Sequence, residues 1–66
     1  MPHTYYVFST GTNFKPVTKS SILLAEIEMH KYCKKHNITG LECTECDKHE
    51  RKYSNHKGVR FYINRI

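Results

Sequence analysis

Cysteine and histidine side chains gather in the middle of the chain with a spacing that suits metal binding. Cys43 and Cys46 are separated by two residues, which lets both thiolates reach one zinc ion. Cys33 and His36 are three positions apart, so they share a face if their segment is helical. These four residues together form a candidate tetrahedral Cys₃His set. A structural metal would also stabilise a chain of only 66 residues.

Other features of the same residues argue against a metal. No Gly or Pro tightens the Cys43–Cys46 segment into a knuckle, and no second pair of ligands with similar spacing follows. In a regular strand, Cys43 and Cys46 would point to opposite faces. The alternative is that Cys33 and Cys43 are small buried residues. We therefore expect no cofactor and keep zinc as the alternative. A redox role for Cys43 and Cys46 is disfavoured. Redox-active pairs with this spacing usually lie at the N-terminus of a helix, which lowers the pKa of a thiol.

Basic residues alternate with tyrosines in the C-terminal third of the chain. Residues 47–66 hold six Lys and Arg against two acidic residues, whereas residues 1–46 are nearly balanced. Tyr and Arg are favoured anchors of protein interfaces, and cations with aromatic rings also hold nucleic acids. The remaining interpretation is that these residues form an outer sheet face that only contacts solvent. The residues predicted to bind a partner are Arg51, Lys52, Tyr53, Lys57, Arg60 and Tyr62.

Three apolar residues form a second candidate surface. At 100° per residue, Leu23, Leu24 and Ile27 fall away from the apolar stripe of the helix predicted for this segment. Three large apolar side chains this close together form a patch that needs a cover. Three alternatives could cover the patch: the rest of the chain, another protein or a second copy of this chain. The sequence therefore leaves open a homodimer through the helix.

Composition excludes several classes of protein. The chain carries 11 Lys and Arg against 6 Asp and Glu, a net charge of +5, and has no apolar run long enough to span a membrane. It lacks a glycine-rich phosphate loop and the common hydrolase and metalloprotease motifs, so we expect no enzyme. With three cysteines and no visible secretory signal, we expect a reducing, cytoplasmic location.

The elements that position these residues follow from local patterns. Residues 3–9 predict a strand, and apolar residues on both of its faces favour a central strand that is covered on both sides. Residues 14–17 could return as a second strand, which Pro16 demotes to an edge or a loop. A helix is predicted over residues 20–36. Its expected core face comprises Ile22, Ala25, Met29, Tyr32, Cys33 and His36.

The C-terminal half predicts further strands. Residues 41–46 favour a strand that residues 47–53 could extend, and residues 54–58 favour a hairpin loop. Residues 59–66 alternate as a half-buried strand does. Its inner face would carry Val59, Phe61 and Ile63, and its outer face Arg60, Tyr62 and Asn64. The predicted fold is a single α+β domain over residues 1–66. It has one helix on an antiparallel sheet of three or four strands, in the order β-(β)-α-β-β.

These observations predict a small non-enzymatic binding or regulatory protein that occupies or blocks a surface of a macromolecular partner. A protein partner is favoured over nucleic acid, because the chain offers both an apolar patch and a face rich in Tyr and Arg. The alternative is a basic nucleic-acid-binding module, with or without zinc. In its short length and its Tyr, Lys and Asn content, the chain resembles the small accessory proteins that phages use against host machinery. That resemblance implies an inhibitor.

Overall fold

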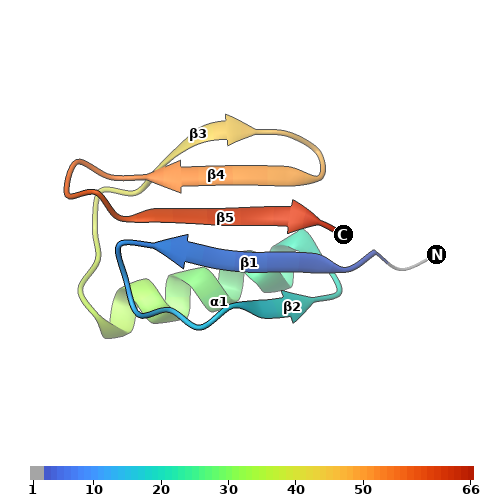
Figure 1. Ribbon diagram of the computed structural model, residues 1–66, viewed down its shortest axis with the longest axis horizontal. Coiled ribbons are helices and arrows are strands. Elements are labelled where there is room, and N and C mark those ends of the chain that lie inside the picture. Colours follow the sequence, from blue (N-terminus) through green and yellow to red (C-terminus); the bar gives the residue numbers. More distant parts are fainter. Residues whose placement is uncertain (1–2) are drawn as a thin grey trace.

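A computed structural model of the chain describes residues 3–66, which form one helix and a five-stranded antiparallel sheet. The strands lie in the order β2-β1-β5-β4-β3, and the helix packs along β1, β2 and β5 (Figure 1). At the opposite edge of the sheet, β4 and β3 extend beyond the helix. The elements are β1 Tyr5–Thr10, β2 Val17–Lys19, α1 Ile22–Lys35, β3 Glu42–Cys46, β4 Glu50–Ser54 and β5 Arg60–Arg65.

The structure confirms the α+β class, but the predicted number of strands is too low. Residues 47–53 do not extend the preceding strand, because the chain reverses at Asp47. The Asp47 backbone N–H donates to the Glu50 carbonyl at 2.8 Å, and the Asp47 carboxylate accepts from the Lys48 N–H at 2.7 Å. β3 and β4 are therefore the two arms of a hairpin. A second strand also exists, but it is the edge strand β2 at Val17–Lys19, so only Val17 of the expected residues 14–17 belongs to it.

The core lies between α1 and the two central strands. Val7 on β1 pairs with Ile63 on β5, and both side chains are fully buried. The helix contributes Ala25, Met29 and Cys33, which recur every four residues and so lie along one face. These three residues confirm the predicted core stripe. The other predicted members are less buried: Ile22 and Tyr32 are half-buried and His36 is exposed.

Both ends of the helix are set by local chemistry. The Ser21 side chain accepts a hydrogen bond from the Leu24 backbone N–H at 3.1 Å, so the helix begins one residue after this cap. His36 ends the helix as its C-cap, which explains why it does not reach the core. Asn37 follows in the left-handed region, at φ 56°. Within residues 3–66 the structure contains no helix with the length and apolar character needed to cross a membrane.

The two faces of the sheet differ, because a single helix can cover only one of them. Tyr5 and Val7 of β1 are buried toward α1. Tyr6 and Phe8 alternate with them and point to the opposite face, where Tyr6 remains 36% exposed. The prediction that this strand is covered on both sides is therefore wrong. We call the uncovered side the open face.

Candidate functional site

Three aromatic rings lie next to one another on the open face. Phe8 and Tyr62 are cross-strand partners, and their rings stack with centroids 4.8 Å apart and 17° between the planes. The ring of Tyr6, two residues along β1, lies 5.5 Å from that of Phe8. Cross-strand aromatic pairs stabilise a sheet and fix the orientation of each ring. We call Tyr6, Phe8 and Tyr62 the aromatic row.

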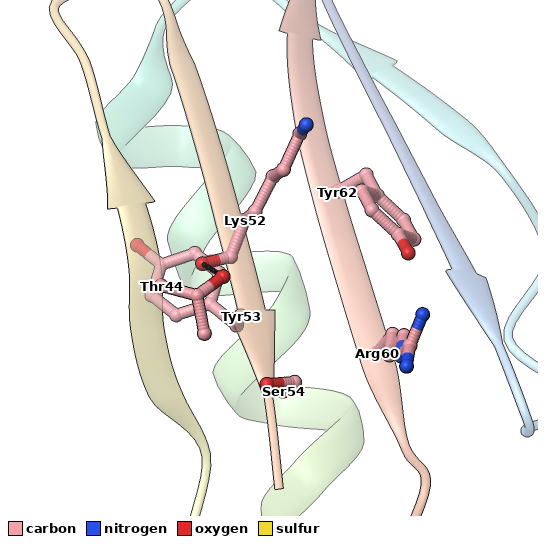
Figure 2. Close-up of a pocket in the computed structure, with 6 residues that line it drawn as sticks. All are labelled: Thr44, Lys52, Tyr53, Ser54, Arg60 and Tyr62. Carbon is pink, nitrogen blue, oxygen red and sulfur yellow. Dashed lines mark hydrogen bonds between the residues drawn. The ribbon is translucent and has the colours of Figure 1, made fainter.

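A hollow of about 350 Å³ adjoins the aromatic row where β3, β4 and β5 run together (Figure 2). Arg60 and Tyr62 stand on the same side of β5, because they are two residues apart. The Thr44 hydroxyl donates to the Lys52 carbonyl at 3.3 Å and holds the edge of the hollow together. The residues that line the hollow are Thr44, Lys52, Tyr53, Ser54, Arg60 and Tyr62.

The charges on the open face are mixed, with a small excess of acid. The strand register places Glu42, Glu45 and Glu50 on the same side as the aromatic row. Lys52 and Arg60 are the basic residues of β4 and β5 on this side. Lys52 is paired with Glu45, with 3.3 Å between its Nζ and the carboxylate. The guanidinium of Arg60 therefore stands beside the aromatic row as a cation for which the structure records no ion pair.

The six residues predicted to bind a partner do not share one face. Arg51, Lys52 and Tyr53 are consecutive in β4, so Lys52 points to the open face and its two neighbours point to the helix side. Lys52 joins Arg60 and Tyr62, whereas Lys57 lies in the turn between β4 and β5. Strand alternation therefore divides the predicted set into three locations.

Arg51 and Tyr53 are held on the helix side by Glu26 of α1. The Tyr53 hydroxyl donates to the Glu26 carboxylate at 2.9 Å, and the Arg51 Nε lies 3.6 Å from the same oxygen. Burial raises the pKa of the Tyr53 phenol well above its ordinary value, and the neighbouring Glu26 carboxylate raises it further. These two side chains connect β4 to the helix, so we assign them a structural role.

Tyr6 and Phe8 were not predicted to be surface residues. They lie within residues 3–9, where apolar residues on both faces favoured a strand that is covered on both sides. A signal was present in the strand that pairs with β1. Tyr62 lies between Arg60 and Asn64 on the predicted outer face of the last strand. Residues that pair directly across two antiparallel strands point to the same face, so the partners of Tyr62 and Asn64, which are Phe8 and Tyr6, also point outward.

The predicted zinc ligands are not brought together. Cys33 is buried between α1 and the sheet, whereas Cys43 and Cys46 are exposed on the edge strand β3, which lies beyond the helix. The His36 ring packs against Tyr32, with 4.2 Å between the ring centroids. In the part of the chain that the structure describes, no group of three or more His, Cys, Asp and Glu is placed to hold a metal ion.

The apolar patch on α1 is a second exposed surface. Leu23 is 67% exposed, and Leu24 and Ile27 are 44% and 43% exposed. Since the core stripe of α1 faces the sheet, these residues lie on the outer side of the helix. Neither the first strand nor the loop at Phe14 buries them. The patch therefore remains a second candidate contact surface.

The chain was compared with protein-family models, curated proteins and solved structures, and none of the three comparisons gave a match. The function is therefore inferred from the surfaces themselves. Of these, the aromatic row combines three ordered rings with a neighbouring Arg60, which makes no ion pair within residues 3–66.

Proposed function

We propose that the protein is a small non-enzymatic binding protein that occupies a surface of a partner protein with its open face. The observation that carries the proposal is the stacked pair Phe8 and Tyr62 on an uncovered sheet face, with Tyr6 and Arg60 beside it. Tyr and Arg are enriched among the residues that contribute most to protein interfaces. By occupying such a surface, a domain of this size acts as an inhibitor or regulator of its partner.

The rigidity of the aromatic row supports this proposal. Binding costs free energy when mobile side chains become ordered, at about 0.5–1.5 kcal/mol for each flexible one. Phe8 and Tyr62 are already ordered by their stacking and by the two central strands that carry them. These rings therefore lose little side-chain entropy when a partner binds, so little of the free energy gained by apolar burial is lost.

The size of the open face also suits a protein partner. The domain measures 37 × 21 × 15 Å, so the sheet face is its broad side. Stable interfaces bury about 800 Å² on each partner. We expect a partner to contact this broad face, with the aromatic row near the centre and the charged residues of β3 and β4 at the rim.

The charges on the open face favour protein over nucleic acid. Phosphate groups that approach the aromatic row would meet the carboxylates of Glu42, Glu45 and Glu50. Much of the net charge of +5 lies elsewhere, for example on Lys34 and Lys35 in the last turn of the helix. Nucleic-acid binding depends on cations that neutralise phosphates, and this face has a slight excess of acid. The basic nucleic-acid module therefore becomes the alternative outcome of the test.

Affinity capture with matched variants tests the proposal. The bait is the full chain, immobilised and exposed to lysate of the cells in which it is naturally made. The test variant combines Arg60→Ala with Tyr62→Ala on the open face, and the control combines Leu23→Ser with Ile27→Ser on the apolar patch. Circular dichroism and thermal unfolding show that each bait is folded. Each capture is repeated with nuclease and at high salt.

The proposal predicts that the same partner protein is retained by the wild type and by the helix control and is lost with the open-face variant. Retention should survive nuclease and fall little with salt, because an apolar interface is less sensitive to salt than phosphate contacts are. Loss of binding on nuclease treatment would favour the nucleic-acid module instead. Loss with the helix control alone would move the interface to the apolar patch.

A further inference from the structure

A bulge in β3 places Cys43 and Cys46 on the same face of the strand. Cys43 pairs with Tyr53 and Cys46 pairs with Arg51, and the register shifts between Cys43 and Glu45. Thr44 is therefore the extra residue of the bulge. Because Arg51 and Tyr53 are two residues apart, they share a face, and so do the cysteines opposite them. A regular strand would have separated the two thiols.

The spacing that results lies at the upper end of the range that allows a covalent link. Two residues on the same face of a strand lie about 6.6 Å apart, from a rise of ~3.3 Å per residue. Disulfide-linked residues have Cα atoms between about 4.4 and 6.8 Å apart. The two thiols also affect each other. The pKa of the Cys43 thiol is raised mainly by partial desolvation against the sheet, and the neighbouring Cys46 side chain raises it further.

Both thiols can be reached from solvent. Cys43 and Cys46 are free and exposed on the edge strand, whereas Cys33 is buried in the core and cannot compete for either of them. The Arg51 guanidinium contacts Cys46, and this hydrogen bond is the main cause of the raised pKa of Arg51.

Two thiols alone do not make up a structural zinc site. Structural zinc takes four ligands, and among residues 3–66 no third His, Cys, Asp or Glu completes a metal-binding group here. The chemistry that two adjacent thiols perform on their own is disulfide formation.

We propose that Cys43 and Cys46 are a modification site at which the two thiols are oxidised to an intramolecular disulfide by exchange with a low-molecular-weight disulfide. One cysteine thiolate attacks the reagent, forms a mixed disulfide and releases one reagent thiol. The second cysteine attacks the sulfur of the first and releases the other reagent thiol. The two cysteines lose two protons and two electrons, and the reagent disulfide is reduced to two thiols.

This site is independent of the proposed binding function, although it borders the same sheet. Glu45 lies between the two cysteines in the chain and forms the ion pair with Lys52 on the open face. The disulfide closes the segment that contains Thr44 and Glu45. Oxidation therefore fixes the bulge at the rim of the hollow.

The experiment incubates the Cys33→Ser variant of the full chain with an excess of oxidised glutathione. Intact mass is then measured before and after alkylation. The expected product has lost the mass of two hydrogens, carries no glutathione and accepts no alkylating reagent. The matched controls Cys43→Ser and Cys46→Ser, each in the Cys33→Ser background, should instead accumulate a mixed disulfide with one glutathione.

The proposal is overturned if both cysteines of the Cys33→Ser variant stay open to alkylation or if each retains a glutathione. If Cys33→Ser does not fold, the wild-type chain is treated in the same way and digested. The disulfide-linked peptide must then join Cys43 to Cys46. A link that includes Cys33, or no link, contradicts the proposal.

Discussion

Phe8 and Tyr62 lie directly opposite each other on β1 and β5, and their rings stack 4.8 Å apart on the side of the sheet that the helix leaves uncovered. The register of the two central strands fixes this relationship, because the same pairing buries Val7 against Ile63 on the other side. A slip by one residue would turn both core residues outward. The free energy that fixes the core therefore also holds this half-buried stack in place on the open face.

Met29→Ala tests the orientation of the helix. Met29 is fully buried between α1 and the sheet, so its truncation leaves a cavity and should lower the free energy of unfolding by about 2–5 kcal/mol. The control is Leu23→Ala on the outer side of the same helix, which should cost less than about 0.5 kcal/mol. Urea unfolding of both variants measures the two values. Equal losses would contradict the placement of the core stripe.

Gly11→Ala tests the close approach of two turns. Gly11 has φ +78°, and a Cβ at this position would lie 2.7 Å from the carbonyl oxygen of Gly58. Gly58 has φ +85° with open space around its Cβ position, so Gly58→Ala introduces only the left-handed strain of about 1–2 kcal/mol. Gly11→Ala should be more destabilising than Gly58→Ala by about 1 kcal/mol or more, since backbone must move. Thermal unfolding compares them, and equal midpoints would rule out the contact.

Tyr53→Phe tests the link between β4 and the helix. Removal of the hydroxyl deletes the hydrogen bond to Glu26 and should lower the free energy of unfolding at neutral pH by about 1 kcal/mol. The pKa of the phenol is raised in the folded state. Its contribution is therefore fully present below about pH 10, the ordinary pKa of tyrosine, and is lost as the pH rises above that value.

The measurement is urea unfolding of the wild type and of Tyr53→Phe at pH 8 and at a pH of about 11. The wild type should lose more stability across this range than the variant, because only the wild type carries the shifted phenol. A parallel pH dependence in the two proteins would show that the pKa of the Tyr53 phenol is not raised in the folded state.

The strongest periodic patterns predicted the fold most accurately. The helix with Ala25, Met29 and Cys33 inward, and the last strand with Phe61 and Ile63 inward, could be predicted because burial of one face imposes a fixed period on the sequence. The turn at Asp47 could not. It contains no Gly or Pro, and its geometry depends on two hydrogen bonds made by Asp47. A run of polar residues looks the same in a turn of this kind and in an extended strand.

The candidate site was predictable only in part, because a pattern of apolar residues does not state how many layers cover a sheet. Tyr62 and Arg60 were placed on the outer face by alternation alone. Tyr6 and Phe8 required knowledge that one helix leaves their side of β1 open. Cys43 and Cys46 share a face only because of the bulge at Thr44, and a bulge is a property of strand pairing that a single strand does not show.

Hydroxyl-radical footprinting of the complex with the captured partner tests the central claim most directly, because it measures which side chains the partner covers. Binding through the open face predicts lower labelling of Tyr6, Phe8 and Tyr62 in the complex, with unchanged labelling of Leu23 and Leu24 on the outer side of the helix. Unchanged labelling of the aromatic row, with protection confined to the helix residues, would contradict the account.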